Sequence, residues 1–296
     1  MTYTLYDATL DLARLLGPVR DGAATSVGTA TTVIDTRVME PNDWYNGGTM
    51  WLPEHVYHDP GGGGGIEPSI QTESSKAVLI SDYASSTTTY TVEGLSWPVE
   101  AGVNYSATNK KFPLFLLKQA VRQAVREIGP VALEKTFESD GSQTYYAYTW
   151  NGSAYVAGAA AEIDERIARI EISSQTGEPR DWKLHRGWMT EPYRTNGHKQ
   201  LVFFPGKEPA SGQTIRLIYL AEHAALVNDS DVIDAQIHPD YLMWVASVYA
   251  WRWRLSMVRE DEPEAPERLK EAQAMAAQMA YKHRISRTEL SSFGRW

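Results

Sequence analysis

Hydrophobic residues recur at helical spacing in four stretches of the chain. In the clearest stretch, Leu114, Leu117 and Val121 fall on one side of the predicted helix, and Lys118 and Arg122 fall on the other. The predicted helices are an N-terminal helix that ends at Gly17-Pro18, Pro113–Ile128, about Asp240–Val258, and a last helix that ends near Arg287. We expect the last two to pair as an antiparallel hairpin.

Strands are predicted where β-branched and aromatic residues lie between turn residues. Asn151-Gly152 between aromatic flanks is a strong hairpin signal. In contrast, residues 41–68 have the composition of a loop and include a run of glycines at Gly61–Gly65. The predicted strands are Thr31–Val38, a hairpin of Lys76–Tyr83 with Thr87–Glu93, and, in a β-rich block from Val131 to Leu220, Thr144–Trp150, Arg166–Ser173, Trp182–Met189, Gln200–Phe204 and Thr214–Leu220.

These elements predict an α+β protein. The expected architecture is a helical bundle formed by the N-terminal, central and two C-terminal helices, with an inserted antiparallel β-rich domain. The predicted parts are residues 1–130 (N-terminal helix, β-hairpin and loop insertion, central helix), 131–222 (β-rich domain), 223–290 (C-terminal helical hairpin completing the bundle) and 291–296 (C-terminal tail).

Composition narrows the class of protein. Hydrophobic residues make up 43% of the 296 residues, which is enough to bury a core. The net charge of -9 argues against a protein that wraps nucleic acid or binds anionic membranes. The absence of cysteine excludes disulfides, thiolate metal sites and a cysteine nucleophile. No run reaches the roughly 18 apolar residues of a membrane span, and the first residues lack a signal peptide's basic region, so we expect a cytoplasmic, non-membrane protein.

Three segments invite a chemical interpretation, and each lacks something that the chemistry requires. His55 and His58 lie on a segment whose spacing does not fix both rings on one face. Gly61–Gly65 is not followed by the lysine of a phosphate-binding loop. Asn228–Asp231 lacks the glycine and distal glutamate of a calcium loop, which favours a turn before a helix. We therefore predict no catalytic residue, no metal, no cofactor and no enzyme activity.

The most unusual segment lies on the predicted helix 240–258, where aromatic and arginine residues alternate. Its candidate interface residues are Tyr249, Trp251, Arg252, Trp253 and Arg254. Tryptophan, tyrosine and arginine are enriched at interface hot spots, which favours a partner-binding helix. Equally, the helix could be central in a bundle, with its arginines paired to the acidic run Glu260–Glu262. Both interpretations remain open at this stage.

Four stretches of the chain form a familiar order. They are Arg14–Val19 followed by Thr31–Asp35, the strand–turn–strand Ala77–Val92, the helix Leu117–Gly129, and an ending in which Ile215–Ala221 and a polar turn precede two helices. In this pattern and order, along most of its length, the chain resembles the head-to-tail adaptor (connector) proteins of tailed bacteriophages. The run Gly61–Gly65 and the block from Val131 to Leu220 exceed the minimal adaptor.

The resemblance implies a structural, non-enzymatic protein of the virion neck, assembled in the host cytoplasm. Such adaptors form a homo-oligomeric ring of about twelve copies beneath the portal, bind the next neck or tail protein, and let DNA pass during ejection without sequence-specific binding. The same resemblance makes Ser291–Trp296 the candidate portal-docking tail, with Phe293, Arg295 and Trp296 as its anchors.

Two alternatives remain open. One is a tail or baseplate component whose β block docks another ring. The other is a carbohydrate-binding or carbohydrate-cleaving virion protein that uses the tyrosine- and tryptophan-rich strands, because aromatic side chains line many sugar-binding clefts and paired carboxylates need not be close in sequence.

Overall fold

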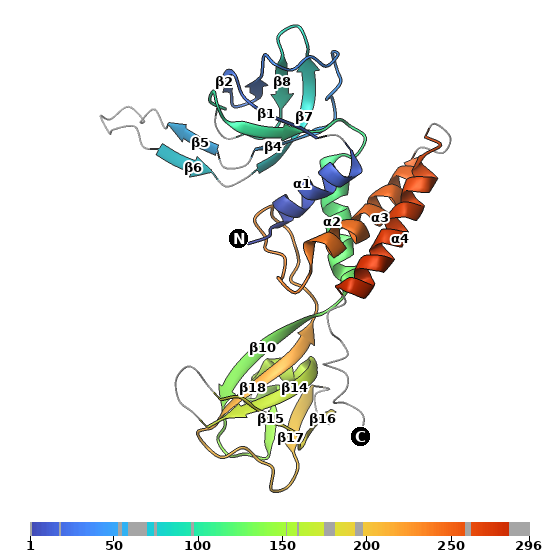
Figure 1. Cartoon of the computed structure of the whole chain (residues 1–296). Helices are drawn as coiled ribbons and strands as arrows, with labels where there is room; N and C mark the ends of the chain where they lie inside the picture. The colour runs from blue at the N-terminus through green and yellow to red at the C-terminus, as the bar shows by residue number, and fades with distance from the viewer. Residues whose placement is uncertain are drawn as a thin grey trace, which may run out of the picture. The chain divides into compact units, whose positions relative to one another are not determined.

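The chain folds into two compact units in the computed structural model, shown in Figure 1. Unit 1 combines the chain up to Ile128 with Ala224–His283, and unit 2 holds Gly129–His223. Unit 2 is therefore inserted into the sequence of unit 1. The structure describes residues 2–17, 19–52, 55–58, 70–73, 76–95, 98–151, 153–158, 160–174, 181–192, 198–257 and 262–283.

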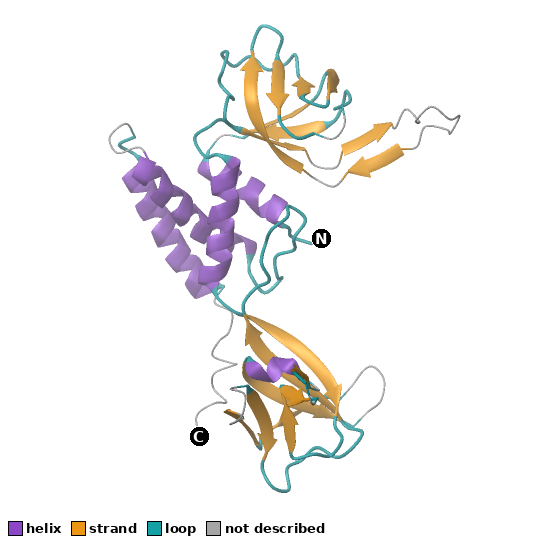
Figure 2. Ribbon diagram, turned by 180° about the vertical axis from the view of Figure 1, so that it is seen from behind, coloured by secondary structure: helices purple, strands orange, loops and turns teal. Residues whose placement is uncertain are grey.

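Four helices of unit 1 pack against one another, as the purple ribbons of Figure 2 show. They are α1 (Leu5–Leu16), α2 (Leu114–Ile128), α3 (Pro239–Met257) and α4 (Ala265–Lys282). Helix α3 contacts the other three, and it buries residues around much of its circumference for that reason. The side chains at the centre of this packing are fully buried: Leu242 and Ala246 of α3, Leu12 of α1, and Leu117 and Val121 of α2.

Helix α1 is anchored at its N-terminal end by the polar turn that precedes α3. Thr4 and Asp7 form a capping box, which satisfies the first free backbone amides of the helix. The Leu5 amide donates to the carbonyl of Asp231 at 2.9 Å, and Lys118 of α2 binds the Asp229 carboxylate at 2.5 Å. This turn thus joins the N-terminal helix to the helices that follow it.

A seven-stranded antiparallel sheet lies between α1 and α2 in sequence. Its strand order is β1-β9-β4-β7-β8-β3-β2. The strands are β1 (Arg20–Ala23), β2 (Ser26–Thr29), β3 (Thr32–Ile34), β4 (Thr49–Leu52), β7 (Lys76–Ala84), β8 (Thr89–Val92) and β9 (Asn104–Ala107), and a separate antiparallel pair consists of β5 (His55–His58) and β6 (Ile70–Glu73).

The sheet is curved so strongly that its two ends are joined by the chain itself. Strands β1 and β2 stand at opposite ends of the strand order, yet only Ala24 and Thr25 separate them. The Ala24 amide donates to the carbonyl of Val103, whereas the Thr25 amide donates to the carbonyl of Ile34. The bent segment Ala24–Thr25 is therefore hydrogen-bonded to both ends of the strand order. The sheet curves around a hydrophobic core of its own as a result.

Tyrosines occupy the interior of this sheet. Tyr45, Tyr83, Tyr90 and Tyr105 are buried, with ring centroids of successive pairs 4.9 to 5.5 Å apart. Such edge-to-face and tilted contacts are the favoured arrangement of aromatic rings. A buried tyrosine brings a hydroxyl that requires a polar partner, and the sheet supplies a carboxylate.

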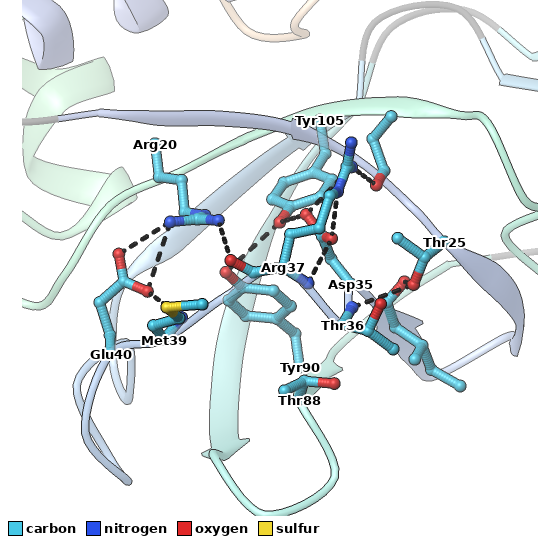
Figure 3. A network of polar contacts seen from close by, with 12 residues as sticks. Arg20, Thr25, Asp35, Thr36, Arg37, Met39, Glu40, Thr88, Tyr90 and Tyr105 are labelled. Atoms are coloured by element: carbon cyan, nitrogen blue, oxygen red, sulfur yellow. Dashed lines mark hydrogen bonds and ion pairs between the residues drawn. The ribbon is translucent and has the colours of Figure 1, made fainter.

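That carboxylate belongs to Asp35, which is 1% exposed and is the centre of the network in Figure 3. It accepts hydrogen bonds from the Tyr105 hydroxyl at 2.8 Å and from Nε of Arg37 at 2.9 Å. Burial opposes ionisation of Asp35, but the hydrogen bonds from Arg37 and Tyr105 outweigh it, so its pKa lies below the ordinary value. Gly22 is required beside it, because a Cβ there would lie 2.8 Å from the Tyr105 ring.

Unit 2 is a β structure built on a long antiparallel pairing of β10 with β18. Val131 lies opposite Ala221 at one end of the ladder and Glu138 opposite Thr214 at the other. Its four-stranded sheet is β10 (Val131–Glu138), β18 (Thr214–Ala221), β14 (Arg166–Ser173) and β15 (Lys183–His185); the three-stranded sheet is β11 (Thr144–Tyr146), β17 (Lys199–Phe203) and β16 (Trp188–Pro192); and the hairpin is β12 (Tyr148–Trp150) with β13 (Tyr155–Ala157).

The core of unit 2 lies between these sheets and a short 3-10 helix, Ala161–Asp164. It is formed by one cluster of buried residues, Tyr145, Ala147, Ala160, Ile163, Ile170, Leu201, Phe203, Ile215 and Leu217. Alternate residues of β18 supply Ile215 and Leu217, as expected for a strand with one face buried.

The expected architecture, a helical bundle with one inserted β domain, was wrong. The protein is α+β, but seven strands between Arg20 and Ala107 form a large curved antiparallel sheet with a core of its own, where we expected a helical bundle carrying a hairpin and loops. The physical reason lies in strand length. Strands β1, β2 and β4 have four residues each, and β1 and β2 contain glycine and polar residues, so no alternation of apolar and polar positions identifies them.

Because its pKa is lowered in the folded protein, Asp35 stabilises the fold above the unfolded pKa of about 3.9, and this stabilisation is lost as pH falls through the lower folded value. We predict that Asp35→Asn lowers the free energy of unfolding by about 2–3 kcal/mol at pH 7. The difference from the wild type should shrink below about pH 4. Urea unfolding at several pH values measures both the loss of stability and its pH dependence. The control is Asp82→Asn, at an exposed position of β7. A loss of stability that does not change with pH would contradict the role of the ionised Asp35 carboxylate.

Candidate interaction surface

Helix α3 carries the aromatic and arginine residues predicted to form an interface. Trp251 is 7% exposed, and its ring contacts that of Phe112 edge to face with centroids 5.0 Å apart. The Lys111 ammonium lies over the same indole at 5.4 Å. Trp251 therefore belongs to the core of unit 1, where it fixes the segment before α2 against α3.

Arg254 is paired within the chain. Its guanidinium binds the Glu262 carboxylate at 2.5 Å and donates to the carbonyl of Lys111 at 3.3 Å. The hydrogen bond and charge of Arg254 hold the pKa of Glu262 below its ordinary value. This pairing is the one that the acidic run after α3 predicted for a central helix.

Tyr249 and Trp253, also on α3, are half-buried and lie on the side of the helix away from Trp251. We define the α2–α3 patch as Phe115, Tyr249, Arg252, Trp253 and Met257. Tyr249, Trp253 and Met257 recur at a spacing of four, so they share one side of α3. Phe115 is 63% exposed and Met257 is 66% exposed. Large apolar side chains clustered at the surface mark binding sites more often than single exposed ones do.

Contacts within the patch hold its members together. The rings of Phe115 and Trp253 meet edge to face with centroids 6.2 Å apart. The Arg252 guanidinium lies 5.8 Å from the centre of the Tyr249 ring. A hydrogen bond to Glu127 raises the pKa of Tyr249, so this hydroxyl stays protonated. The α2–α3 patch thus exposes Phe115, Arg252 and Met257, with Tyr249 and Trp253 half-buried beside them.

A cleft of about 420 Å³ lies beside α1, α3 and α4. Trp244 and Trp251 form part of its wall, and basic and acidic side chains surround them. The charges are partly neutralised within the chain, for example by the ion pair of Arg268 with Glu271 at 3.0 Å. The cleft therefore suits a segment that carries an apolar side chain with charged neighbours.

The curved sheet carries a second, more open cleft of about 470 Å³. Met39, 93% exposed, and Trp44, 49% exposed, lie on the loop that follows the Asp35 network. Arg20 lines the same cleft, and it binds Glu40 at 3.0 Å. Of these residues, Trp44 stands in the segment 41–68 that we interpreted as a loop, and neither Met39 nor Trp44 carries a sequence pattern that distinguishes it from a core residue.

The remaining predicted sites are placed as follows. Phe293, Arg295 and Trp296 lie outside the described residues, and so do Gly61–Gly65 and the side chains of His55 and His58. In the polar turn before α3, Asp231 accepts from the amides of Val227 and Asn228. This is the behaviour of a turn rather than of a calcium loop. Within the described parts of the chain, no helix is long and apolar enough to cross a bilayer.

Comparison with known proteins adds no relative: no protein family, no curated protein and no solved structure matches this chain.

Replacing Trp251 by alanine removes a buried indole that contacts Phe112 and Lys111. We predict that Trp251→Ala lowers the free energy of unfolding by about 3–5 kcal/mol. The exposed neighbour on the same helix is the matched control, and Arg252→Ala should change stability by no more than about 0.5 kcal/mol. Chemical denaturation of the full chain measures both, and a near-neutral Trp251→Ala would contradict the core assignment.

Proposed function

We propose that the chain is a structural neck protein of a tailed-bacteriophage virion. In this proposal it is a head-to-tail adaptor that forms a ring of about twelve copies, binds the portal on one side and the next neck or tail protein on the other, and lets DNA pass. The observation that carries the proposal is the α2–α3 patch. It supplies the residue types of an interface hot spot on a firmly packed helix.

The packing beneath the patch supports a role in assembly. Trp251 fills the core directly beside Arg252 and Trp253, and Arg254 is held by Glu262. The exposed side chains are therefore displayed from a helix whose other faces are occupied by α1, α2 and α4. A rigid base lowers the entropy lost on binding, so the same contacts give a tighter complex.

Charge agrees with a DNA channel. The net charge of -9 gives no general attraction to the phosphate backbone, whose neutralisation by lysine and arginine dominates DNA affinity. A ring that must release its DNA benefits from weak binding. An adaptor would then use its arginines, such as Arg252, for protein contacts.

Unit 2 supports a second candidate function, carbohydrate binding in the virion. Tyr148 lies against the His198 ring at 4.2 Å, and Tyr155 lies at 6.4 Å from the same ring and is 37% exposed. Asp164 accepts from the Lys199 amide at 2.6 Å and contacts Nδ1 of His198 at 2.5 Å. Glycan binding by the full chain that Tyr155→Ala removes would favour this candidate over a purely structural role.

The first test of the adaptor proposal is ring formation. We predict that the purified chain forms rings in negative-stain images, alone or with a portal ring, and that Phe115→Glu and Arg252→Glu abolish the rings by placing negative charge in the interface. Because both positions are exposed, thermal unfolding should change little. Tyr281→Glu, at a residue 91% exposed on α4 and outside the patch, is the matched control and should keep the rings. Intact rings in the patch variants would refute the role of the patch.

The second test concerns the C-terminal tail. We predict that deleting Ser291–Trp296 leaves the circular dichroism spectrum and the melting temperature unchanged but prevents co-sedimentation with a portal ring. Substituting Phe293 and Trp296 by alanine in the full chain should reproduce this loss, because aromatic anchors dominate interface energies. Unchanged portal binding by both variants would exclude the tail as the docking segment, whatever the outcome for the patch.

A further inference from the structure

Two histidines and an aspartate meet where the first turn of α3 lies beside the last turn of α4. His238 immediately precedes α3, Asp240 stands in its first turn, and His283 caps the C-terminal end of α4. One possible ligand atom from each of the three residues lies within 4.8 Å of the others. The imidazole rings of the two histidines are stacked, with centroids 3.6 Å apart and an angle of 18° between their planes.

The polar atoms of this cluster are incompletely satisfied by the protein. Among the residues that the structure describes, Nε2 of His283 is buried without a hydrogen-bond partner. Nδ1 of His238 lies 3.9 Å from the Asp240 carboxylate and accepts a hydrogen bond of 3.2 Å from the Asp240 amide. A buried nitrogen without a partner loses its hydration and gains nothing in return. The cluster therefore offers a buried ring nitrogen of His283 beside two exposed side chains, His238 and Asp240, that are free to reorient.

We propose that His238, Asp240 and His283 bind a divalent first-row transition-metal ion, with Zn²⁺ as the preferred occupant. Imidazole nitrogen and carboxylate oxygen are ligands that Zn²⁺ accepts at about 2.0–2.2 Å, and three protein ligands leave one position for water. The lone pairs of two stacked imidazoles lie in nearly parallel planes and do not converge on one point, so binding requires the rings to part. Rotation of the exposed His238 and Asp240 side chains would turn their ligand atoms toward His283 and shorten the separations, now up to 4.8 Å, to those of a tetrahedral site. Mg²⁺ and Ca²⁺ are disfavoured, because they prefer all-oxygen sites.

The surroundings suit a cation. The C-terminal end of α4 directs its free carbonyl groups, the negative end of the helix dipole, toward this region, and the Asp240 carboxylate adds a full negative charge. The positive end of the α3 dipole repels a cation, but the negative charge of Asp240, in the first turn of α3, offsets this repulsion. When the ion binds, the lone pair on Nδ1 of His238 would coordinate it. The coordinate bond would replace the single weak hydrogen bond that this nitrogen accepts from the Asp240 amide.

A bound ion would join the N-terminal end of α3 to the C-terminal end of α4, which lie far apart in sequence. At the opposite end, α3 and α4 are already joined by Arg254 with Glu262. Helix α4 buries only Ala265 and Ala272 fully, so its attachment to α3 depends on few apolar contacts. The ion would therefore add a polar cross-link to a helix that buries few side chains completely, and this effect is independent of the adaptor proposal.

The test is a zinc titration of the full chain, purified without a histidine tag and treated with a chelator. We expect one Zn²⁺ per chain by calorimetry, and a melting temperature higher by roughly 5 °C at a zinc concentration about 100 times Kd. Co²⁺ should give the visible absorption of a nitrogen-coordinated ion. Asp240→Asn and His283→Ala should each weaken Zn²⁺ binding at least about tenfold.

The matched control is His198→Ala, because His198 also contacts a carboxylate, Asp164, but has no second histidine in reach among the described residues. That variant should bind Zn²⁺ as the wild type does. Asp240→Asn preserves side-chain shape, so it remains informative if His283→Ala unfolds the hairpin. Zinc binding unchanged in Asp240→Asn and His283→Ala, or absent from the wild type below millimolar zinc, would overturn the proposal. Failure of ring assembly would leave this result unaffected.

Discussion

The pairing of β10 with β18 is the constraint on which the organisation of the chain depends. Unit 1 is discontinuous in sequence, and α2 and α3, which pack against each other, are separated by all of unit 2. The eight-residue ladder places Val131 opposite Ala221, so the chain leaves unit 1 and returns to it at neighbouring points. Such a closure holds a long insertion at a modest entropic cost, because the cost of loop closure grows only slowly with length.

The helices could be predicted from sequence because each has a clear signal at its ends or along one face. The stripe that contains Leu117 and Val121 is buried as its spacing indicates, and the turn before α3 forms its hydrogen bonds through Asp231. The curved sheet could not be predicted. Its order brings β4 beside β9 and β8 beside β3, and these pairings depend on tertiary contacts between short segments.

The candidate surfaces show the same division between local and long-range information. The sequence singled out α3, but the alternation of tryptophan and arginine there does not show which tryptophan faces the core. Trp251 packs against Phe112, and Trp253 packs against Phe115 in the patch, and both contacts depend on how the segment around α2 lies against α3. The cluster of His238 and His283 was missed for a similar reason. The two residues become neighbours only once α3 and α4 are antiparallel, and metal-ligand spacing along the sequence gives no indication of it.

The bent link at Ala24 and Thr25 affects how copies of this chain can contact one another through the curved sheet. An exposed sheet edge offers unpaired amides and carbonyls, and chains held at high local concentration can polymerise through such edges. Here the amides of Ala24 and Thr25 are bonded to Val103 and Ile34, so the link between the first and last strands of the sheet offers neither of these amides to another chain. At this position, copies of the chain would have to recognise one another through side chains, which can be selective, because the backbone amides are already occupied.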